Sequence, residues 1–125
     1  MDAEVRSPFQ FKLKRNNCQA LVAAQINIQS SKNGEWGDIT APIHLVNYLD
    51  DDEVSRQITD VRGLKAYKLI VRLEATEVRD LGGAYDFELS VGDTVLRAEE
   101  GNVDEDPNTL EVRGRTYFGI LLVRN

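Results

Sequence analysis

The chain has few of the residues on which disulfides, metal sites and many catalytic centres depend. It contains one cysteine, Cys18, and one histidine, His44, in 125 residues. A lone cysteine excludes a disulfide within the chain, and a metal site with several nitrogen or sulfur ligands cannot be built from these two residues alone. We therefore expect Cys18 and His44, both in strand-like segments, to be structural residues.

Catalytic motifs are also lacking. No serine is surrounded by a nucleophile elbow, and the pair Gly82-Gly83 precedes a strand-like segment rather than a helix, unlike the glycines of phosphate-binding loops. A pair of carboxylates alone does not make a glycosidase, because a domain of this size leaves little room for a substrate cleft. We expect a protein that is not an enzyme, with no catalytic residues and no cofactor.

Long hydrophobic runs and an excess of positive charge are absent as well. The longest apolar run, Tyr117 to Val123, is far shorter than the roughly 20 residues of a membrane-spanning helix, and the first residues lack the apolar segment of a secretory signal. The 15 basic and 21 acidic residues give a net charge of −6, which repels a phosphate backbone. Neither a membrane nor a nucleic acid is expected as a partner.

What the sequence does contain is alternation of apolar and polar residues, most clearly between Gly83 and Gly101. This period of two predicts a half-buried strand, which Gly92-Asp93 interrupts as a tight turn before Val95 to Ala98 resumes it. The predicted element is a β-hairpin. The apolar residues on one face of its first strand are Tyr85, Phe87, Leu89 and Val91.

Further strands are predicted on both sides of this hairpin. Lysines between the apolar residues of the first strand favour an edge position. The predicted strands lie at Phe9 to Leu13, Cys18 to Gln29, Ile43 to Leu49, Ala66 to Ala75, Leu110 to Val112 and Tyr117 to Val123.

One short helix is predicted after the acidic run Asp50 to Glu53. Asp51 or Asp52 would cap its start and Gly63 would end it. The residues with helical spacing are Val54, Ile58 and Val61.

These elements define an all-β fold, either a β-sandwich or a small barrel of about eight strands with at most one short helix. We expect residues 1–8 to form an irregular N-terminal arm and residues 9–125 to form a single β-domain. The charges also predict that Ala66 to Ala75 pairs antiparallel with the first hairpin strand, which sets Leu73 against Tyr85 and Arg72 against Asp86.

Two strands are apolar on both faces, which indicates either burial on both sides or a contact with another subunit. Trp36, beside the turn at Asn33-Gly34, either covers the edge of the core or serves as an exposed platform for a partner or a sugar ring. The candidate interface residues are Ile43, Leu45, Tyr117, Phe118, Ile120 and Leu122.

The acidic runs Asp50 to Glu53 and Asp104 to Asp106 are the one candidate for a metal site. Calcium takes oxygen ligands from loops, but neither run has the spacing of a calcium-binding loop, so solvated turns are the favoured interpretation and no metal is expected.

The region from Leu73 to Val112 resembles bacteriophage virion proteins of the immunoglobulin-like or baseplate-adaptor type. Those proteins share an L-x-A-T strand, an L-x-G-x-Y-x-x-x-L hairpin and a G-x-V-x-x-x-P-x-T segment. The matching residues here are Leu73, Ala75, Thr76, Leu81, Gly83, Tyr85, Leu89, Gly101, Val103, Pro107 and Thr109.

This resemblance implies a non-enzymatic virion structural protein, assembled in the host cytoplasm, whose partners are a major capsid or tail protein and further copies of itself. The apolar C-terminal strand, with no fibre or coiled-coil extension after it, favours a capsid cement or decoration protein or a small tail or baseplate component. The alternative is a monomeric ligand-binding module for carbohydrate or calcium, with Trp36, Tyr48 and Tyr117 as candidate platforms.

Overall fold

The computed structural model of the chain is built of strands arranged in two sheets. It describes residues 2–47, 52–59, 61, 65–77, 82–103 and 111–124, and no helix occurs within these ranges. The strands are β1 (Ala3–Arg6), β2 (Phe9–Arg15), β3 (Leu21–Lys32), β4 (Glu35–Asp38), β5 (Ile43–Asn47), β6 (Glu53–Ile58), β7 (Lys65–Thr76), β8 (Ala84–Val91), β9 (Thr94–Asn102) and β10 (Glu111–Arg124).

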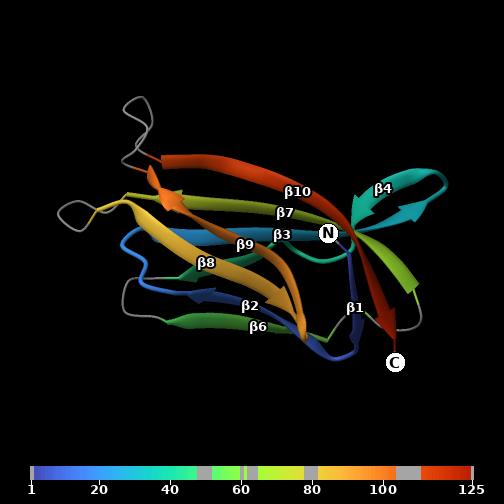
Figure 1. The fold of residues 1–125 in the computed structure, drawn as a ribbon. Helices are drawn as coiled ribbons and strands as arrows, with labels where there is room; N and C mark the ends of the chain where they lie inside the picture. Colours follow the sequence, from blue (N-terminus) through green and yellow to red (C-terminus); the bar gives the residue numbers. More distant parts are fainter. Residues whose placement is uncertain are drawn as a thin grey trace.

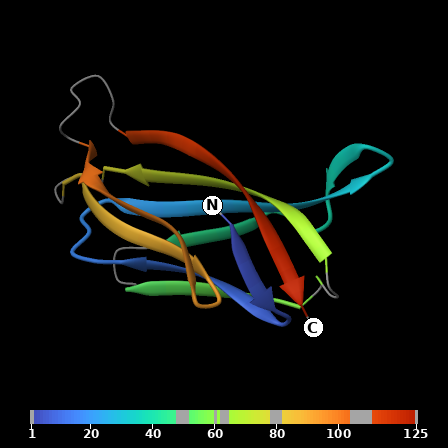
Figure 2. The same ribbon diagram turned by 45° about the vertical axis from the view of Figure 1, so that its right-hand side comes forward.

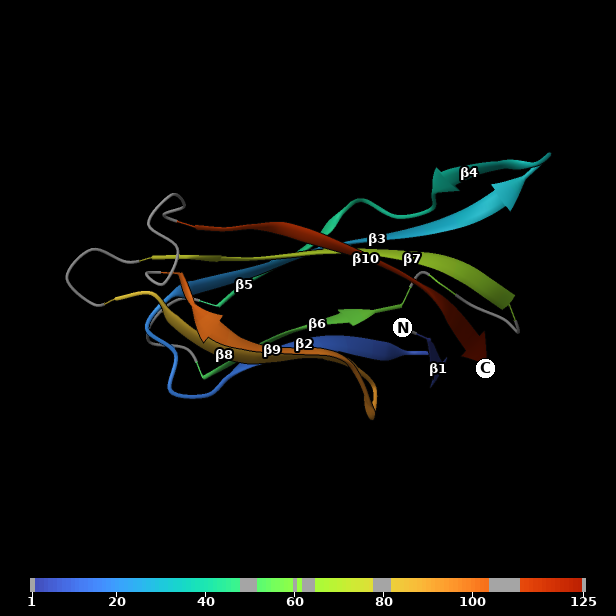
Figure 3. The same cartoon turned by 45° about the horizontal axis from the view of Figure 1, so that its top comes forward.

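One sheet has six strands in the order β1-β10-β7-β3-β4, with β5 also paired to β3, and the other has four in the order β6-β2-β8-β9 (Figure 1). All strand pairs are antiparallel except β1 and β10, which run in parallel. Figure 3 shows the two sheets as two layers, and Figure 2 shows β1 beside the final residues of β10, with the β3–β4 hairpin projecting from the body. The all-β class is therefore confirmed.

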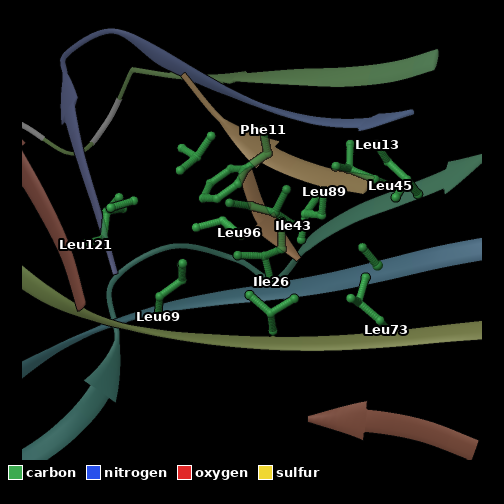
Figure 4. Packing of buried hydrophobic residues seen from close by; sticks show 14 of the residues in the cluster. Phe11, Leu13, Ile26, Ile43, Leu45, Leu69, Leu73, Leu89, Leu96 and Leu121 are labelled. Carbon is green, nitrogen blue, oxygen red and sulfur yellow. The ribbon is translucent and has the colours of Figure 1, made fainter. Parts of the chain in front are cut away.

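The core lies between the two sheets because alternate residues of each strand point inward. The inner positions of β7 and β3 are almost fully buried, and they face the inner positions of β2 and β8 across the core (Figure 4). The largest fully buried side chains are Phe11, Leu13, Ile26, Ile28, Leu69, Leu89, Leu121, Val22, Val61, Val71, Val91 and Val123.

Both predicted tight turns are confirmed. Gly92, between β8 and β9, has a φ of 54°, and Asn33 and Gly34, between β3 and β4, have φ values of 55° and 81°. Positive φ at two successive residues is the geometry of a type I′ turn, which matches the right-handed twist of the strands it joins. The turn at Asn33-Gly34 thereby fixes the position of Trp36 in the returning strand.

The predicted helix is wrong, since Glu53–Ile58 is strand β6. β6 forms an antiparallel ladder with β2, in which Ile58 lies opposite Phe9 and Val54 opposite Leu13. The spacing of Val54, Ile58 and Val61 matches a helix, but Val54 and Ile58, four residues apart, also share one face of a strand. Because this segment pairs with β2, it forms a strand with a period of two rather than a helix.

The predicted pairing between the hairpin and the preceding strand is also wrong, because β7 and β8 lie in different sheets. β7 lies between β10 and β3, and β8 lies between β2 and β9. Arg72 faces Thr116 and Gln25 across its ladders, whereas Asp86 faces Glu100. Alternating apolar residues show only that each of two strands buries one face. This pattern arises equally when the strands are hydrogen-bonded neighbours in one sheet and when they lie in two sheets that face each other across a core.

Two smaller expectations are corrected. The strand predicted at an edge, β2, lies between β6 and β8, and its Lys12 pairs with Glu53 of β6 at 3.5 Å. Ala3–Arg6, assigned to an irregular arm, is strand β1 and buries Ala3 and Val5 against the core. The turn expected at Pro107 and Asn108 lies outside the described residues. No helix in the described ranges is long and apolar enough to span a bilayer.

Candidate interaction surface

The outer face of the six-stranded sheet carries a group of apolar and aromatic side chains that the core does not use. Residues opposite each other in a ladder share a face, so the outer residues can be read from the register. Phe118 lies opposite Ile70, Ile120 opposite Lys68, and Trp36 opposite Ser31. We call the following residues the outer-face cluster: Trp36, Lys68, Ile70, Phe118, Ile120 and Leu122.

Several members of this cluster are open to solvent. The exposed fraction is 59% for Phe118, 49% for Trp36 and 45% for Ile120, whereas Leu121 and Val123 on the inner face of β10 are at 0%. β10 is therefore apolar on both faces, but only its inner face is covered within the chain. Exposed aromatic groups gathered on one surface of a domain are typical of an interaction site.

Lys68 joins the two aromatic residues of the cluster. Its Nζ lies 5.8 Å from the ring centroid of Trp36 and 5.3 Å from that of Phe118. Both distances fall within the range of cation–π attraction, so the half-buried lysine holds the β4 tryptophan toward β10. In the described part of the chain, no ion pair to a carboxylate is formed by Lys68.

Asp38 fixes β4 to the sheet beside this lysine. Its carboxylate accepts hydrogen bonds from Nε2 of Gln29 at 2.9 Å and from Nδ2 of Asn27 at 3.2 Å. These contacts, together with the turn at Asn33-Gly34, keep Trp36 on the outer face. The exposed placement of the tryptophan is therefore built into the hairpin.

The structure separates the six predicted interface residues into two groups. Phe118, Ile120 and Leu122 lie on the outer face of β10. Ile43 and Leu45 do not: each is 3% exposed and points into the core, so the single chain already covers them. The outer side of β5 carries His44, which is exposed, rather than a second apolar surface.

Tyr117, the sixth predicted residue, points to the inner side of β10 and takes part in a bridge between the sheets. Its hydroxyl donates a hydrogen bond to Glu99 Oε1, while Glu99 Oε2 lies 3.3 Å from Nη1 of Arg115. Arg97 stacks on the Tyr117 ring at 3.9 Å and approaches Glu99 at 3.5 Å. Contact with Tyr117 raises the pKa of Arg97. Charged side chains turned inward protect the free edge of β9 from pairing with other strands.

One open hollow of about 530 Å³ lies between β1, the start of β2 and the turn at Gly92-Asp93. A cavity of about 10 Å³ lies beneath the bridge, which is room for about one water molecule. A wider, open depression on the outer face is lined by Ala23, Ala24, Gln25, His44, Val46, Arg72 and Glu74.

Other candidates are placed as follows. Tyr48, Asp50, Asp51 and the run Asp104 to Asp106 lie outside the described residues, so the calcium hypothesis is not examined by the structure. Within the described ranges, no cluster of three metal-binding side chains occurs. Cys18 is partly buried and its Sγ lies 3.3 Å from the carbonyl oxygen of Ala20.

Sequence reasoning missed Lys68 and Glu99 as members of these sites. Each was one of several charged residues that alternate with apolar ones, and only the pairing of β10 with β7 and the approach of β9 to β10 distinguishes them.

Comparisons with protein families, with curated proteins and with solved structures found no match to this chain.

Proposed function

We propose that this chain is a non-enzymatic structural protein of a bacteriophage virion, built as a β-sandwich and acting through the outer face of its six-stranded sheet. Its partners in this proposal are a major capsid or tail protein and further copies of itself. The part in the particle is that of a capsid cement or decoration protein, or of a small tail or baseplate component. The protein is assembled in the host cytoplasm and carries no cofactor.

The observation that carries the proposal is the outer-face cluster. An ordinary antiparallel sheet with one wet side presents polar residues there, but β10 places Phe118, Ile120 and Leu122 on that side. Two of them, together with Trp36, are between 45% and 59% exposed. Burial of such residues against a partner supplies the free energy of association without any catalytic group.

The virion part of the proposal depends on the sequence resemblance, and several residues that carry it have structural roles. Leu73, Tyr85, Leu89 and Val103 belong to the core. Gly101 lies opposite Tyr85, and a Cβ added at Gly101 would come within 2.5 Å of the tyrosine oxygen. Tyr85, Gly101 and Val103 are thus packing residues of one hairpin, whereas Leu81, Pro107 and Thr109 lie outside the described residues.

The test is whether the protein is part of purified particles. We expect quantitative mass spectrometry of density-gradient-purified virions to find this chain in a fixed ratio to a shell or tail protein. An epitope-tagged Phe118→Glu variant should be lost from the particles, whereas Val95→Glu should remain, because Val95 is 52% exposed but lies on the other sheet. A chain found only in the soluble fraction of the lysate would overturn the proposal.

The second candidate function is a carbohydrate-binding module, which the pairing of Trp36 with Phe118 around Lys68 supports. Tyr117, another candidate platform within the described residues, points to the inner face of β10, so Trp36 and Tyr117 do not form one surface. Titration of purified protein with oligosaccharides, followed by the fluorescence of Trp36, separates this function from the first. A saturable change that Phe118→Ala abolishes would favour the module.

A further inference from the structure

We propose that the outer face of the six-stranded sheet is the contact surface of a symmetric dimer, in which a second copy of the chain packs the same face against it. This inference deepens the proposed function and rests on it for its biological role. The two sheets would stack face to face about 10 Å apart, which gives four layers of strands about a twofold axis. Three features of the face point to a second copy as the occupant.

The first feature is charge. The outer ladder positions of the described strands carry four basic and four acidic residues, a net of zero, whereas the chain as a whole carries −6, so the whole excess of negative charge lies outside this face. Two copies therefore repel each other through most of their surface, but not through this face. The charged residues at the outer ladder positions are Arg6, Lys68, Arg72, Arg124, Glu4, Asp38, Glu74 and Glu111.

Some of these charges are already neutralised within the face. Arg124 forms an ion pair with Glu4, whereas Asp38 keeps its charge while its carboxylate accepts hydrogen bonds from two amide groups. What remains is a balanced set of three basic and three acidic residues: Arg6, Lys68 and Arg72 against Asp38, Glu74 and Glu111. A partner that is recognised by its charge would need a strongly charged surface on this face. A second copy of the chain needs only a nearly neutral surface, because each copy presents the same charges to the other.

The second feature is area. At the level of Trp36, five strands lie side by side, and β7 is 12 residues long. β1 and β4 have only four residues each, and the six strands together hold 51 residues. With about 4.8 Å between strands and about 3.3 Å per residue, the whole face covers about 800 Å², which equals the roughly 800 Å² per partner of a stable interface. One face of one sheet is thus large enough for a dimer.

The third feature is the position of the apolar residues within the face. The outer residues of β10 and β7 are apolar at Leu122, Ile120, Phe118 and Ile70, and the aliphatic stem of Lys68 continues this surface toward Trp36. Polar groups surround it, among them Gln29, Asn27 and Arg72 in the facing ladders. An apolar centre with a polar rim is the anatomy of a specific protein interface.

The chain contains its own reporter, because Trp36 is the only tryptophan and lies in this surface at 49% exposure. Analytical ultracentrifugation and Trp36 emission would be recorded together from about 1 μM to about 1 mM protein, the range of weak to moderate dimers. We expect the mass to double, with a blue shift of the emission at the same concentrations. Phe118→Glu should raise the dissociation constant by about 30-fold or more, as expected for an aromatic anchor.

Val95→Glu is the matched control, since it adds the same charge at a site of similar exposure on the four-stranded sheet. It should change both readouts far less than Phe118→Glu does, and urea unfolding of each variant checks that the fold is retained. A protein that stays monomeric throughout, or a dimer that Phe118→Glu does not weaken, would overturn the inference. A monomer that is nevertheless present in purified particles would overturn the dimer and leave the proposed function standing.

Discussion

Glu99 is the residue that ties the two sheets together where β9 approaches β10. It accepts a hydrogen bond from Tyr117 and lies 3.3 Å from Arg115 and 3.5 Å from Arg97, with its side chain only 16% exposed. Glu99→Gln keeps the shape but removes the charge that strengthens these contacts. We expect a loss of about 1 to 2 kcal/mol in the free energy of unfolding, measured by urea denaturation.

The control at this scale is Glu53→Gln. Glu53 lies 3.5 Å from Lys12, but the two side chains are 44% and 36% exposed, so solvent screens the pair. This variant should change the free energy of unfolding by less than about 0.5 kcal/mol. Equal losses for Glu53→Gln and Glu99→Gln would show that the bridge between the sheets adds no more than a surface ion pair.

At the scale of the element, the β3–β4 hairpin depends on one backbone position. Gly34 has a φ of 81° and open space around the site of a Cβ, so Gly34→Ala introduces backbone strain without a clash. The expected loss of hairpin stability is about 1 kcal/mol. When the hairpin amides exchange by local opening, this loss makes their hydrogen exchange about fivefold faster. Mass spectrometry of exchange in the segment around Trp36 measures it.

Gly37→Ala in the same hairpin provides the comparison. A Cβ at Gly37 also meets open space, but Gly37 is not among the positive-φ glycines of the described chain, so its substitution should leave the exchange rates nearly unchanged. If the two alanine variants exchange alike, the turn at Asn33-Gly34 does not depend on left-handed backbone.

The elements also show which features could be predicted from the sequence. β3, β7 and the β8–β9 hairpin were predictable, because alternation over many residues and a turn dipeptide are local signals. Their distribution between two sheets was not, because β7 and β8 bury their apolar faces equally well as neighbours or across a core. β6 was misread for a related reason: its two apolar residues are four apart, a spacing that fits both a helix and a strand.

The candidate surface was predictable in part. The doubly apolar sequence of β10 identified Phe118, Ile120 and Leu122, since alternate residues of a strand point to opposite faces and only one of these faces joins the core. β5 gave the same signal but was misleading, because the second apolar side of its described part consists of Val46 alone, next to an exposed His44. The role of Lys68 depends on contacts between strands far apart in sequence and has no local signal.

At the scale of the whole molecule, the net charge of −6 controls how copies approach each other. Added salt screens the repulsion between two acidic chains, and the Debye length falls from about 14 Å near 0.05 M to about 4 Å near 0.5 M. A dimer held by the apolar residues of the outer face should therefore become tighter with salt, by a few-fold in the dissociation constant. Sodium chloride also weakens any attraction between opposite charges, so the sign of the change is informative.

The measurement is the dissociation constant from sedimentation equilibrium at the two salt concentrations, with Val95→Glu again as the control variant. Because Val95→Glu adds one more negative charge to each copy outside the outer face, its dimer should be slightly weaker at low salt and should converge with the original protein at high salt. A dimer that weakens as salt is added would instead be held by opposite charges. In that case Lys68 and Arg72, rather than Phe118 and Ile120, would be the residues that bind the second copy.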